Sequence, residues 1–265
     1  MKILEIYKQK LRYKNYSPRT IETYTCYLEK FLVSESIYDP YQVTLKTIKD
    51  YLHNRTYSSI STQNQVIGSL KLFAKYILNK KTIHLDKIER PKRQKSLPKV
   101  IEGELLKEKI LAIPNLKHRA ILAIGFSCAL RVSEVINLKM SYIDRSRMII
   151  TIKNSKGRKD RIVKMSHDIL TILDEYYKKY KPSSYLFNGQ FSLQYSATSC
   201  NKLMKKYIGP QSHFHILRHS GATMMHESGL DIMILSKLLG HNSVKTTQIY
   251  THVSNRTIHK IQMPI

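Results

Sequence analysis

Apolar residues recur every three or four positions along most of this chain, a spacing that predicts a mainly helical protein. In the first 87 residues this spacing predicts helices near residues 2–12, 18–32, 44–54 and 61–79. The last of these has the clearest apolar stripe, formed by Val66, Ile67, Leu70, Phe73, Ala74, Ile77 and Leu78. Ser17 and Pro18 are suited to begin the second helix, as a side-chain cap and a first-turn proline. We therefore predict a small helical bundle for residues 1–87.

The second part of the chain has the same helical spacing, interrupted by β-branched residues. Between Met148 and Met165, two β-branched runs flank a polar loop that contains Gly157, which predicts an antiparallel hairpin. A further strand is expected near residues 142–144. Helices are expected at about 102–112, 117–129, 166–181, 196–207, 217–227 and 231–239, and Ser243 is expected to begin a short helix carrying Tyr250. The predicted fold class is mainly α with one small antiparallel β-sheet.

The charge of the chain indicates the kind of partner. There are 45 Lys and Arg against 19 Asp and Glu, a formal net charge of +26. A positive field of this size favours a polyanion, and nucleic acid is the commonest one. A basic membrane-surface protein is the competing interpretation, but the sequence has no long apolar run and no signal peptide. We expect a cytoplasmic, nucleoid-associated protein with no membrane partner.

Residues 88–98 contain two prolines and four cations, and prolines disfavour helix while charges oppose burial. The cations are Arg90, Lys92, Arg93 and Lys95. We predict an exposed basic linker between a helical core-DNA-binding domain, 1–87, and a catalytic domain, 99–265. The linker simply joins the domains in the plainest interpretation. With this net charge we expect it also to lie against DNA phosphates, so that the two domains form a DNA clamp around a duplex.

Cysteines and histidines give no sign of a metal site. Cys26, Cys128 and Cys200 are odd in number and far apart, which is typical of reduced and mostly buried cysteines. His215 and His219 have the i, i+4 spacing of helical metal ligands, but the glutamate of an H-E-x-x-H motif is missing. The intervening arginine would also repel a cation. We expect no metal and no cofactor.

A set of four residues near the C-terminus is suited to phosphate chemistry: His215, Arg218, His241 and Tyr250. Arginine binds phosphate oxygens bidentately, and an imidazole donates to such an oxygen or moves a proton near neutral pH. The phenol is a candidate nucleophile if cationic neighbours favour its anion, since an unperturbed tyrosine has a pKa near ~10. Among eighteen tyrosines, however, a single one is more typically a packing residue.

The surrounding sequence changes this balance. H-I-L-R-H at 215–219, L-G-H at 239–241 and T-T-Q-I-Y-T-H at 246–252 together resemble the C-terminal signature of the tyrosine recombinases, the phage-integrase and Xer-type family. Arg131, in A-L-R-V-S-E-V, resembles the first-arginine motif, with Ser133 expected to cap the next helix. Lys156, before Gly157, resembles the hairpin lysine. At Cys128-Ala129 relatives more often have a small hydroxyl residue and glycine.

The resemblance implies metal-free transesterification on duplex DNA. Arg131, Arg218 and His241 are expected to hold the scissile phosphate, and Tyr250 to attack it, giving a 3′-phosphotyrosyl link and a free 5′-hydroxyl. The expected roles of the remaining residues are proton donation to the leaving oxygen by Lys156, assistance to proton transfer at the tyrosine by His215, orientation of Arg131 by Glu134, and support by His219. The basic neighbours of the hairpin lysine are expected to be backbone-phosphate contacts or solvated charges: Lys153, Arg158, Lys159 and Arg161.

The resemblance also implies partners. It predicts double-stranded DNA with an inverted-repeat core site, a tetrameric synaptic complex, a Holliday-junction intermediate and accessory DNA-bending proteins. The tail after Val253 contains Ile258, Ile261, Met263 and Ile265. Exposed apolar residues of this kind need a partner surface. The sequence alone favours the chain's own domain as that surface, whereas the resemblance implies a neighbouring protomer. Two other classes stay open, a type IB topoisomerase-like nicking and closing enzyme and a catalytically silent DNA-binding protein. Integration, excision and dimer resolution are not distinguished.

Overall fold

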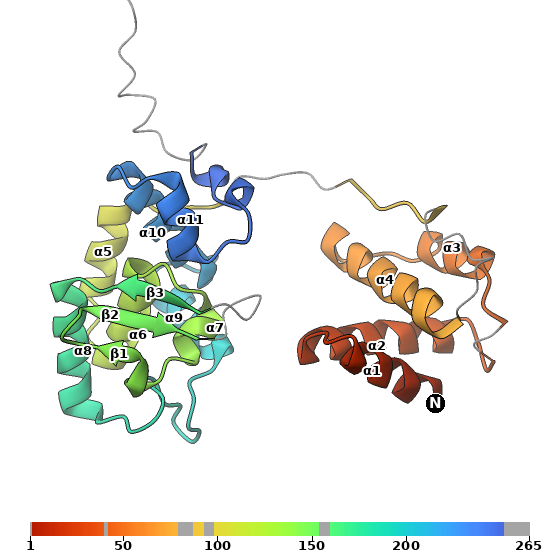
Figure 1. Ribbon diagram of the computed structural model, residues 1–265, viewed down its shortest axis with the longest axis horizontal. Helices are drawn as coiled ribbons and strands as arrows, with labels where there is room; N and C mark the ends of the chain where they lie inside the picture. Colours follow the sequence, from red (N-terminus) through yellow and green to blue (C-terminus); the bar gives the residue numbers. More distant parts are fainter. Residues whose placement is uncertain (1, 40–41, 79–86, 93–97, 154–159, 252–265) are drawn as a thin grey trace, which may run out of the picture. The chain divides into compact units, whose positions relative to one another are not determined.

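A computed structural model describes residues 2–39, 42–78, 87–92, 98–153 and 160–251. The chain separates into two compact units, Met1–Lys95 and Ser96–Ile265, so the division falls inside the segment predicted as a linker. The first unit is helical, and the second combines helices with a three-stranded sheet (Figure 1). The prediction of a mainly α protein with one small antiparallel sheet is confirmed.

In its described residues the first unit has four α-helices: α1 (Lys2–Tyr13), α2 (Pro18–Ser34), α3 (Leu45–His53) and α4 (Ile60–Phe73). As predicted, Ser17 caps α2 by accepting a hydrogen bond from the Thr20 amide, and Pro18 occupies its first turn. The apolar stripe of α4 continues beyond Phe73 in a π-helical segment, Ala74–Leu78. Tyr7 donates to the Ser69 carbonyl at 2.9 Å inside the core, which joins α1 to α4.

The predicted linker begins with residues that pack on this first unit. Ile88 is 4% exposed and belongs to the helical core. The Arg90 guanidinium donates to the carbonyl and to the side-chain oxygen of Asn64 on α4. The prediction that 88–98 is exposed throughout is therefore wrong at its start, because an apolar side chain ahead of the first cation gains free energy by joining the core.

The second unit has seven helices and three strands among the described residues. The helices are α5 (Gly103–Leu111), α6 (Leu116–Ser127), α7 (Val132–Ile136), α8 (His167–Tyr180), α9 (Ala197–Tyr207), α10 (His215–Glu227) and α11 (Ile232–Leu239). Strands β1 (Ile143–Asp144), β2 (Ile149–Ile152) and β3 (Arg161–Lys164) form an antiparallel sheet in that order. Ile150 faces Val163 across the hairpin, and both are buried against the helical core, so the hairpin prediction is confirmed.

Local signals position most of these helices. Ser166 caps α8, Asp231 caps α11, and Gly240 ends α11 with a positive φ of 63°, as predicted. The short helix expected after Ser243 is replaced by two 3₁₀ turns, Val244–Thr246 and Gln248–Tyr250. Within the described residues, no helix is long and apolar enough to span a membrane.

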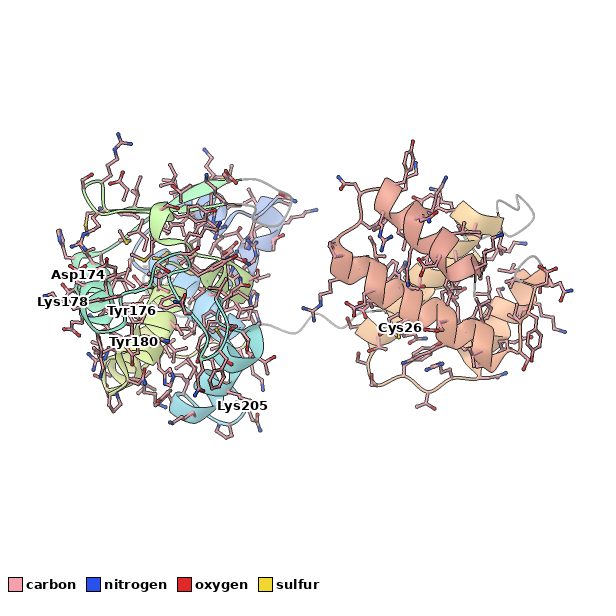
Figure 2. All side chains as sticks on the ribbon, turned by 90° about the horizontal axis from the view of Figure 1, so that it is seen from below. Cys26, Asp174, Tyr176, Lys178, Tyr180 and Lys205 are labelled. Atoms are coloured by element: carbon pink, nitrogen blue, oxygen red, sulfur yellow. The ribbon has the colours of Figure 1, made fainter. Side chains whose placement is uncertain are left out.

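Two of the three cysteines are buried, Cys128 and Cys200, whereas Cys26 is exposed on α2 (Figure 2). Burial raises the pKa of the Cys128 and Cys200 thiols to about 12, so both are neutral packing residues.

Tyr176 and Tyr180, labelled on α8 in the same view, stack with their ring centroids 5.1 Å apart.

Candidate active site

A cavity of about 310 Å³ in the second unit collects the residues that the sequence singled out. It is lined by Arg131, His215, Arg218, His219, Gly240, His241, Asn242, Thr246, Ile249 and Tyr250. Five of the six predicted catalytic residues are therefore neighbours, although 119 positions separate Arg131 from Tyr250 along the chain. The sixth, Lys156, lies outside the described residues, as do Arg93, Lys95, Arg158 and Lys159.

Helix α10 presents three of these side chains on one face. His215, Arg218 and His219 stand at i, i+3 and i+4, which places them side by side on a helix. A neighbouring side of α10 packs closely on α6 at Gly221, where an added Cβ would lie 2.2 Å from the Phe126 carbonyl oxygen. A glycine is needed there, and this close approach fixes the helix that carries the cavity's cationic side.

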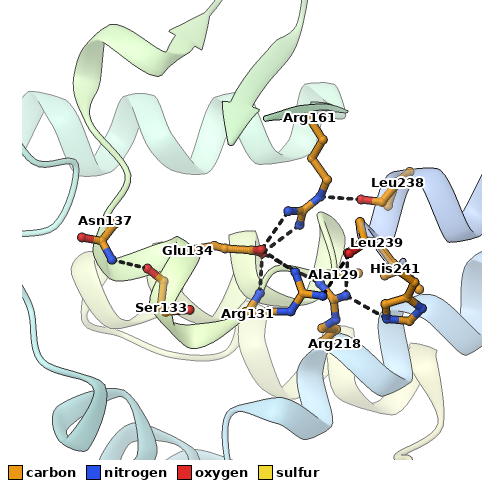
Figure 3. A network of polar contacts seen from close by, with 11 residues as sticks. Ala129, Arg131, Ser133, Glu134, Asn137, Arg161, Arg218, Leu238, Leu239 and His241 are labelled. Atoms are coloured by element: carbon orange, nitrogen blue, oxygen red, sulfur yellow. Dashed lines mark hydrogen bonds and ion pairs between the residues drawn. The ribbon is translucent and has the colours of Figure 1, made fainter. Parts of the chain in front are cut away.

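Three arginines bind the C-terminal end of α11 through consecutive carbonyl oxygens. Arg161 donates to Leu238 at 2.7 Å, Arg218 to Leu239 at 2.6 Å, and Arg131 to Gly240 at 3.3 Å. The last carbonyls of a helix have no partner within the helix and carry a partial negative charge, so they suit guanidinium groups. This end of α11 therefore positions both cavity arginines (Figure 3).

Glu134 is the carboxylate that holds these arginines together. It accepts hydrogen bonds from the side chain and backbone amide of Arg131 and two from the side chain of Arg161, at 2.7–2.8 Å (Figure 3). Arg218 lies 3.8 Å from it. Burial raises the pKa of Glu134, but the hydrogen bonds and charge of Arg161, and those of Arg131, outweigh burial and set the pKa at about 2. The expected contact of Glu134 with Arg131 is present.

The structure contradicts the prediction that Arg161 is a phosphate contact or a solvated charge. Its side chain is 8% exposed, and its guanidinium is engaged by Glu134 and by the Leu238 carbonyl. The reason is its position at the start of β3, beside the end of α11. Lys153, at the other side of the hairpin, is exposed, with its ammonium 5.3 Å from the centre of the Tyr142 ring.

The turn before Arg131 shows how the chain delivers this arginine. Helix α6 ends at Ser127 rather than at the predicted Ala129, and Ala129 has a φ of 47°. Its carbonyl accepts a hydrogen bond from Arg218 at 2.9 Å. The sequence predicted that Ser133 caps the next helix, and this prediction is wrong. Helix α7 already begins at Val132, and the Glu134 side chain accepts a hydrogen bond from the Arg131 amide.

Arg218 and His241 form a pair with a defined protonation state. Arg218 is 1% exposed and donates to His241 Nε2 at 3.1 Å. Because a guanidinium only donates, Nε2 accepts, which places the imidazole proton on Nδ1, 2.9 Å from Thr247 Oγ1. Burial and the charge of Arg218 lower the pKa of His241 to about 4, so its ring is neutral near pH 7. Burial lowers the pKa of Arg218 to about 10, where it stays protonated.

Tyr250 is 1% exposed and packs in a small apolar cluster with Ala129, Ala222, Leu235 and Leu239. Its hydroxyl lies 3.1 Å from His219 Nδ1. Burial raises the pKa of Tyr250, against the opposing charges of Arg218 and Arg131. Arg218 and Arg131 thus favour the phenolate, as expected of cationic neighbours, but desolvation is the larger effect and the phenol keeps its proton. The histidine hydrogen-bonded to the phenol is His219, whereas His215 was expected there.

No group of three or more His, Cys, Asp and Glu residues among the described positions is arranged to hold a metal ion. The cavity is instead lined by two arginines, three histidines and a tyrosine, side chains of the types that can bind a phosphate and attack it. This set of side chains, in a helical unit with a small sheet, is typical of an enzyme that acts on a phosphate ester.

Comparison with known proteins gives the family. A sequence model of the phage integrase family matches residues 104–256, more than half of the chain, and a model of the phage integrase N-terminal SAM-like domain matches residues 3–84. The chain belongs to the phage integrase family and is a tyrosine recombinase of the Xer type, an enzyme that joins DNA strands without a metal ion.

Named relatives agree with this assignment. The chain is 35% identical to the tyrosine recombinase XerA of Pyrococcus horikoshii, over 96% of this chain and 90% of that protein. It is 34% identical to XerA of Pyrococcus furiosus, over 95% and 90%. A crystal structure of XerA recombinase aligns with a TM-score of 0.57 at 29% identity, over 99% of both chains. A lambda integrase dimer bound to a COC′ core site has the same fold, with a TM-score of 0.74 at 16% identity over 99% and 98%.

Proposed function

We propose that this protein cuts and rejoins duplex DNA at a specific site through a 3′-phosphotyrosyl intermediate and a Holliday junction. The observation that carries the proposal is the cavity itself, in which three separate parts of the chain bring together the Tyr250 hydroxyl, the buried Arg218 and the half-buried Arg131. A packing tyrosine needs no such neighbours.

Charge in the cluster favours a bound phosphate. Three guanidinium groups, those of Arg131, Arg161 and Arg218, share one carboxylate, Glu134. Near neutral pH this cluster has a formal charge of +2, and none of its three arginine side chains is more than 18% exposed. A phosphodiester supplies the missing negative charge, and more develops on its oxygens as it is attacked. We assign Arg131 and Arg218 as its direct ligands, with His241 beside them.

The assigned chemistry is an in-line displacement at phosphorus. The Tyr250 oxygen forms a bond to the scissile phosphorus as the bond from phosphorus to the 5′ oxygen breaks. We assign Lys156 as the proton donor to that leaving oxygen and His215, at the cavity rim, as a further phosphate-side residue. The phosphoester is conserved in the protein link, so the 5′ hydroxyl reseals the strand in the reverse reaction without ATP.

The proposed DNA partner is a duplex with an inverted-repeat core site. One structural neighbour is XerH bound to a palindromic difH substrate, and another is the lambda integrase dimer on its core site. The net charge of +26 suits such a partner. We propose that residues 1–87 and 99–265 close on DNA as a clamp, and that the linker cations and Lys153, Arg158 and Lys159 contact its backbone. We also propose that a tetramer exchanging the C-terminal tail, residues 253–265, carries out recombination in the cytoplasm.

A nicked suicide duplex tests this proposal. Loss of a short strand after cleavage traps the enzyme on DNA, and a band that survives denaturation shows the adduct. We expect the adduct in excess EDTA, because arginines supply the charge that a metal ion supplies in other phosphoryl transfers. Failure to form it would favour a silent DNA-binding protein. An adduct without any Holliday-junction product from two sites would favour a type IB topoisomerase-like enzyme.

A further inference from the structure

The Tyr250 hydroxyl and the His219 imidazole form a hydrogen bond of 3.1 Å between two different elements, the last 3₁₀ turn and α10. We propose that His219 is a catalytic residue that accepts the Tyr250 proton through Nδ1 when the tyrosine attacks DNA. This inference rests on the proposed function and assigns a proton acceptor that the resemblance placed at His215.

The geometry fixes both partners before DNA enters. Tyr250 is held by the apolar cluster around Leu235 and Leu239. The imidazole rings of His215 and His219 pack edge to face, with their centroids 4.5 Å apart and their planes at 87°. This contact restricts rotation of the His219 ring. Since His219 follows Arg218 directly, the same helical turn carries the proton acceptor and a phosphate ligand.

The protonation states give the hydrogen bond its direction. Burial and, after it, the charges of His215, Arg218, His213 and His241 together lower the pKa of His219 to about 4. Its imidazole is therefore neutral near pH 7. Burial raises the pKa of Tyr250, so the phenol keeps its proton and donates it. Nδ1 is then the accepting nitrogen, and the imidazole proton lies on Nε2.

The step balances in atoms and charge. The O–H bond of Tyr250 breaks, its proton passes to Nδ1 of His219, and the phenolic oxygen bonds to phosphorus as the 5′ oxygen leaves and takes a proton from Lys156. A bound phosphodiester offsets the positive charge of Arg218, which disfavours an imidazolium at His219. Proton transfer thus becomes favourable only when DNA occupies the cavity. On resealing, the proton returns to the tyrosine.

Replacement by asparagine separates this role from simple positioning. The amide oxygen of Asn stands near the place of Nδ1 and still accepts the phenolic hydrogen bond, but it does not take up the proton. His219→Asn should therefore retain folding and DNA binding and lose cleavage. His226→Asn is the matched control, since His226 lies on the same helix, outside the cavity, with Nδ1 3.5 Å from the Leu230 carbonyl.

The test is single-turnover cleavage of two nicked duplexes, one with the natural oxygen at the scissile 5′ position and one with sulfur there. A thiolate leaves without a proton, so the sulfur duplex reports attack by the tyrosine alone. We expect His219→Asn to cleave both duplexes at least about 100-fold more slowly than wild type. Lys156→Ala should be slow with oxygen and recover with sulfur, and His226→Asn should match wild type.

Three outcomes are decisive. A His219→Asn rate within threefold of wild type on both duplexes would show that the residue only positions the phenol, and recovery on sulfur would place it at the leaving group. Either result overturns the inference and leaves the proposed function intact. If the wild type forms no adduct, the proposed function itself fails. If His219→Asn does not fold, His219→Gln is measured in the same way, with thermal unfolding and DNA binding checked first.

Discussion

The Glu134 carboxylate and the Arg161 guanidinium meet through two parallel hydrogen bonds of 2.7 Å (Figure 3). This pair joins the first turn of α7 to the start of β3, and Arg161 also reaches the last turn of α11. The strand therefore shares a buried charge cluster with the arginines proposed to bind phosphate. Because bidentate pairs of this kind have a fixed geometry, the cluster holds the elements in one register.

Loss of the central carboxylate should be severe. Glu134→Gln leaves three buried or half-buried arginines without their shared anion, and breaking a buried ion pair by removing one partner typically costs about 3–5 kcal/mol. Urea unfolding measures the change in free energy, with Glu108→Gln on the exposed side of α5 as control. A Glu134→Gln protein as stable as the control would contradict the assigned role of this carboxylate.

Arg161 and Lys153 should behave in opposite ways, although both are cations of the same hairpin. Arg161→Met should lower the free energy of unfolding by roughly 3 kcal/mol, because it leaves Glu134 with fewer partners. Lys153→Ala should leave stability unchanged, weaken DNA binding a few-fold and reduce the slope of log binding constant against log salt by about 1. Binding titrations at several salt concentrations decide this. The converse pattern would restore Arg161 as a phosphate contact.

Acid should destabilise the second unit through its neutral histidines. The folded-state pKa values of His219 and His241 are about 4, below the ordinary value of 6.5. Between these values the unfolded chain binds more protons than the folded one, so stability is complete above pH 6.5 and falls as the pH drops towards 4. Urea midpoints at pH 7.5, 6 and 5 should show this fall. It should be smaller in His241→Gln than in the control His167→Gln, and equal slopes would refute the explanation.

The turn at Ala129 should tolerate glycine and reject branched residues. Ala129 is fully buried at a φ of 47°, in the left-handed region that β-branched residues rarely adopt. Ala129→Val should lower the free energy of unfolding by about 2 kcal/mol or more through strain and overpacking. Ala129→Gly should stay within about 1 kcal/mol of wild type, since relief of strain offsets the lost methyl group. Thermal unfolding of both variants is the measurement, and a valine variant as stable as the glycine one would argue against this backbone strain.

Local signals predicted much of the fold. The caps at Ser17, Ser166 and Asp231 and the glycine stop at Gly240 involve only neighbouring residues, so they can be read from the sequence. The C-terminal end of α6 was harder to predict from the sequence. Ala129 has good intrinsic helix propensity, yet the turn that Arg218 stabilises from 89 positions away overrides it.

The site shows the same division. The spacing of His215, Arg218, His241 and Tyr250 identified the cavity because these residues lie in one stretch of sequence that resembles the tyrosine recombinase signature. The partner of a buried charge is set by packing, so the engagement of Arg161 by Glu134 and Leu238 had no local signal. Neither did the contact of Tyr250 with His219, which depends on how the last 3₁₀ turn returns to α10.

The most direct test of the account is whether Tyr250 becomes joined to DNA. Wild type and Tyr250→Phe are incubated with a labelled nicked suicide duplex, and the products are separated on a denaturing gel, with Tyr177→Phe on the exposed side of α8 as control. The account predicts an adduct for wild type and Tyr177→Phe, and none for Tyr250→Phe, which should still bind the duplex because it loses one oxygen and no cation. An adduct formed by Tyr250→Phe would contradict the assignment of Tyr250 as the nucleophile.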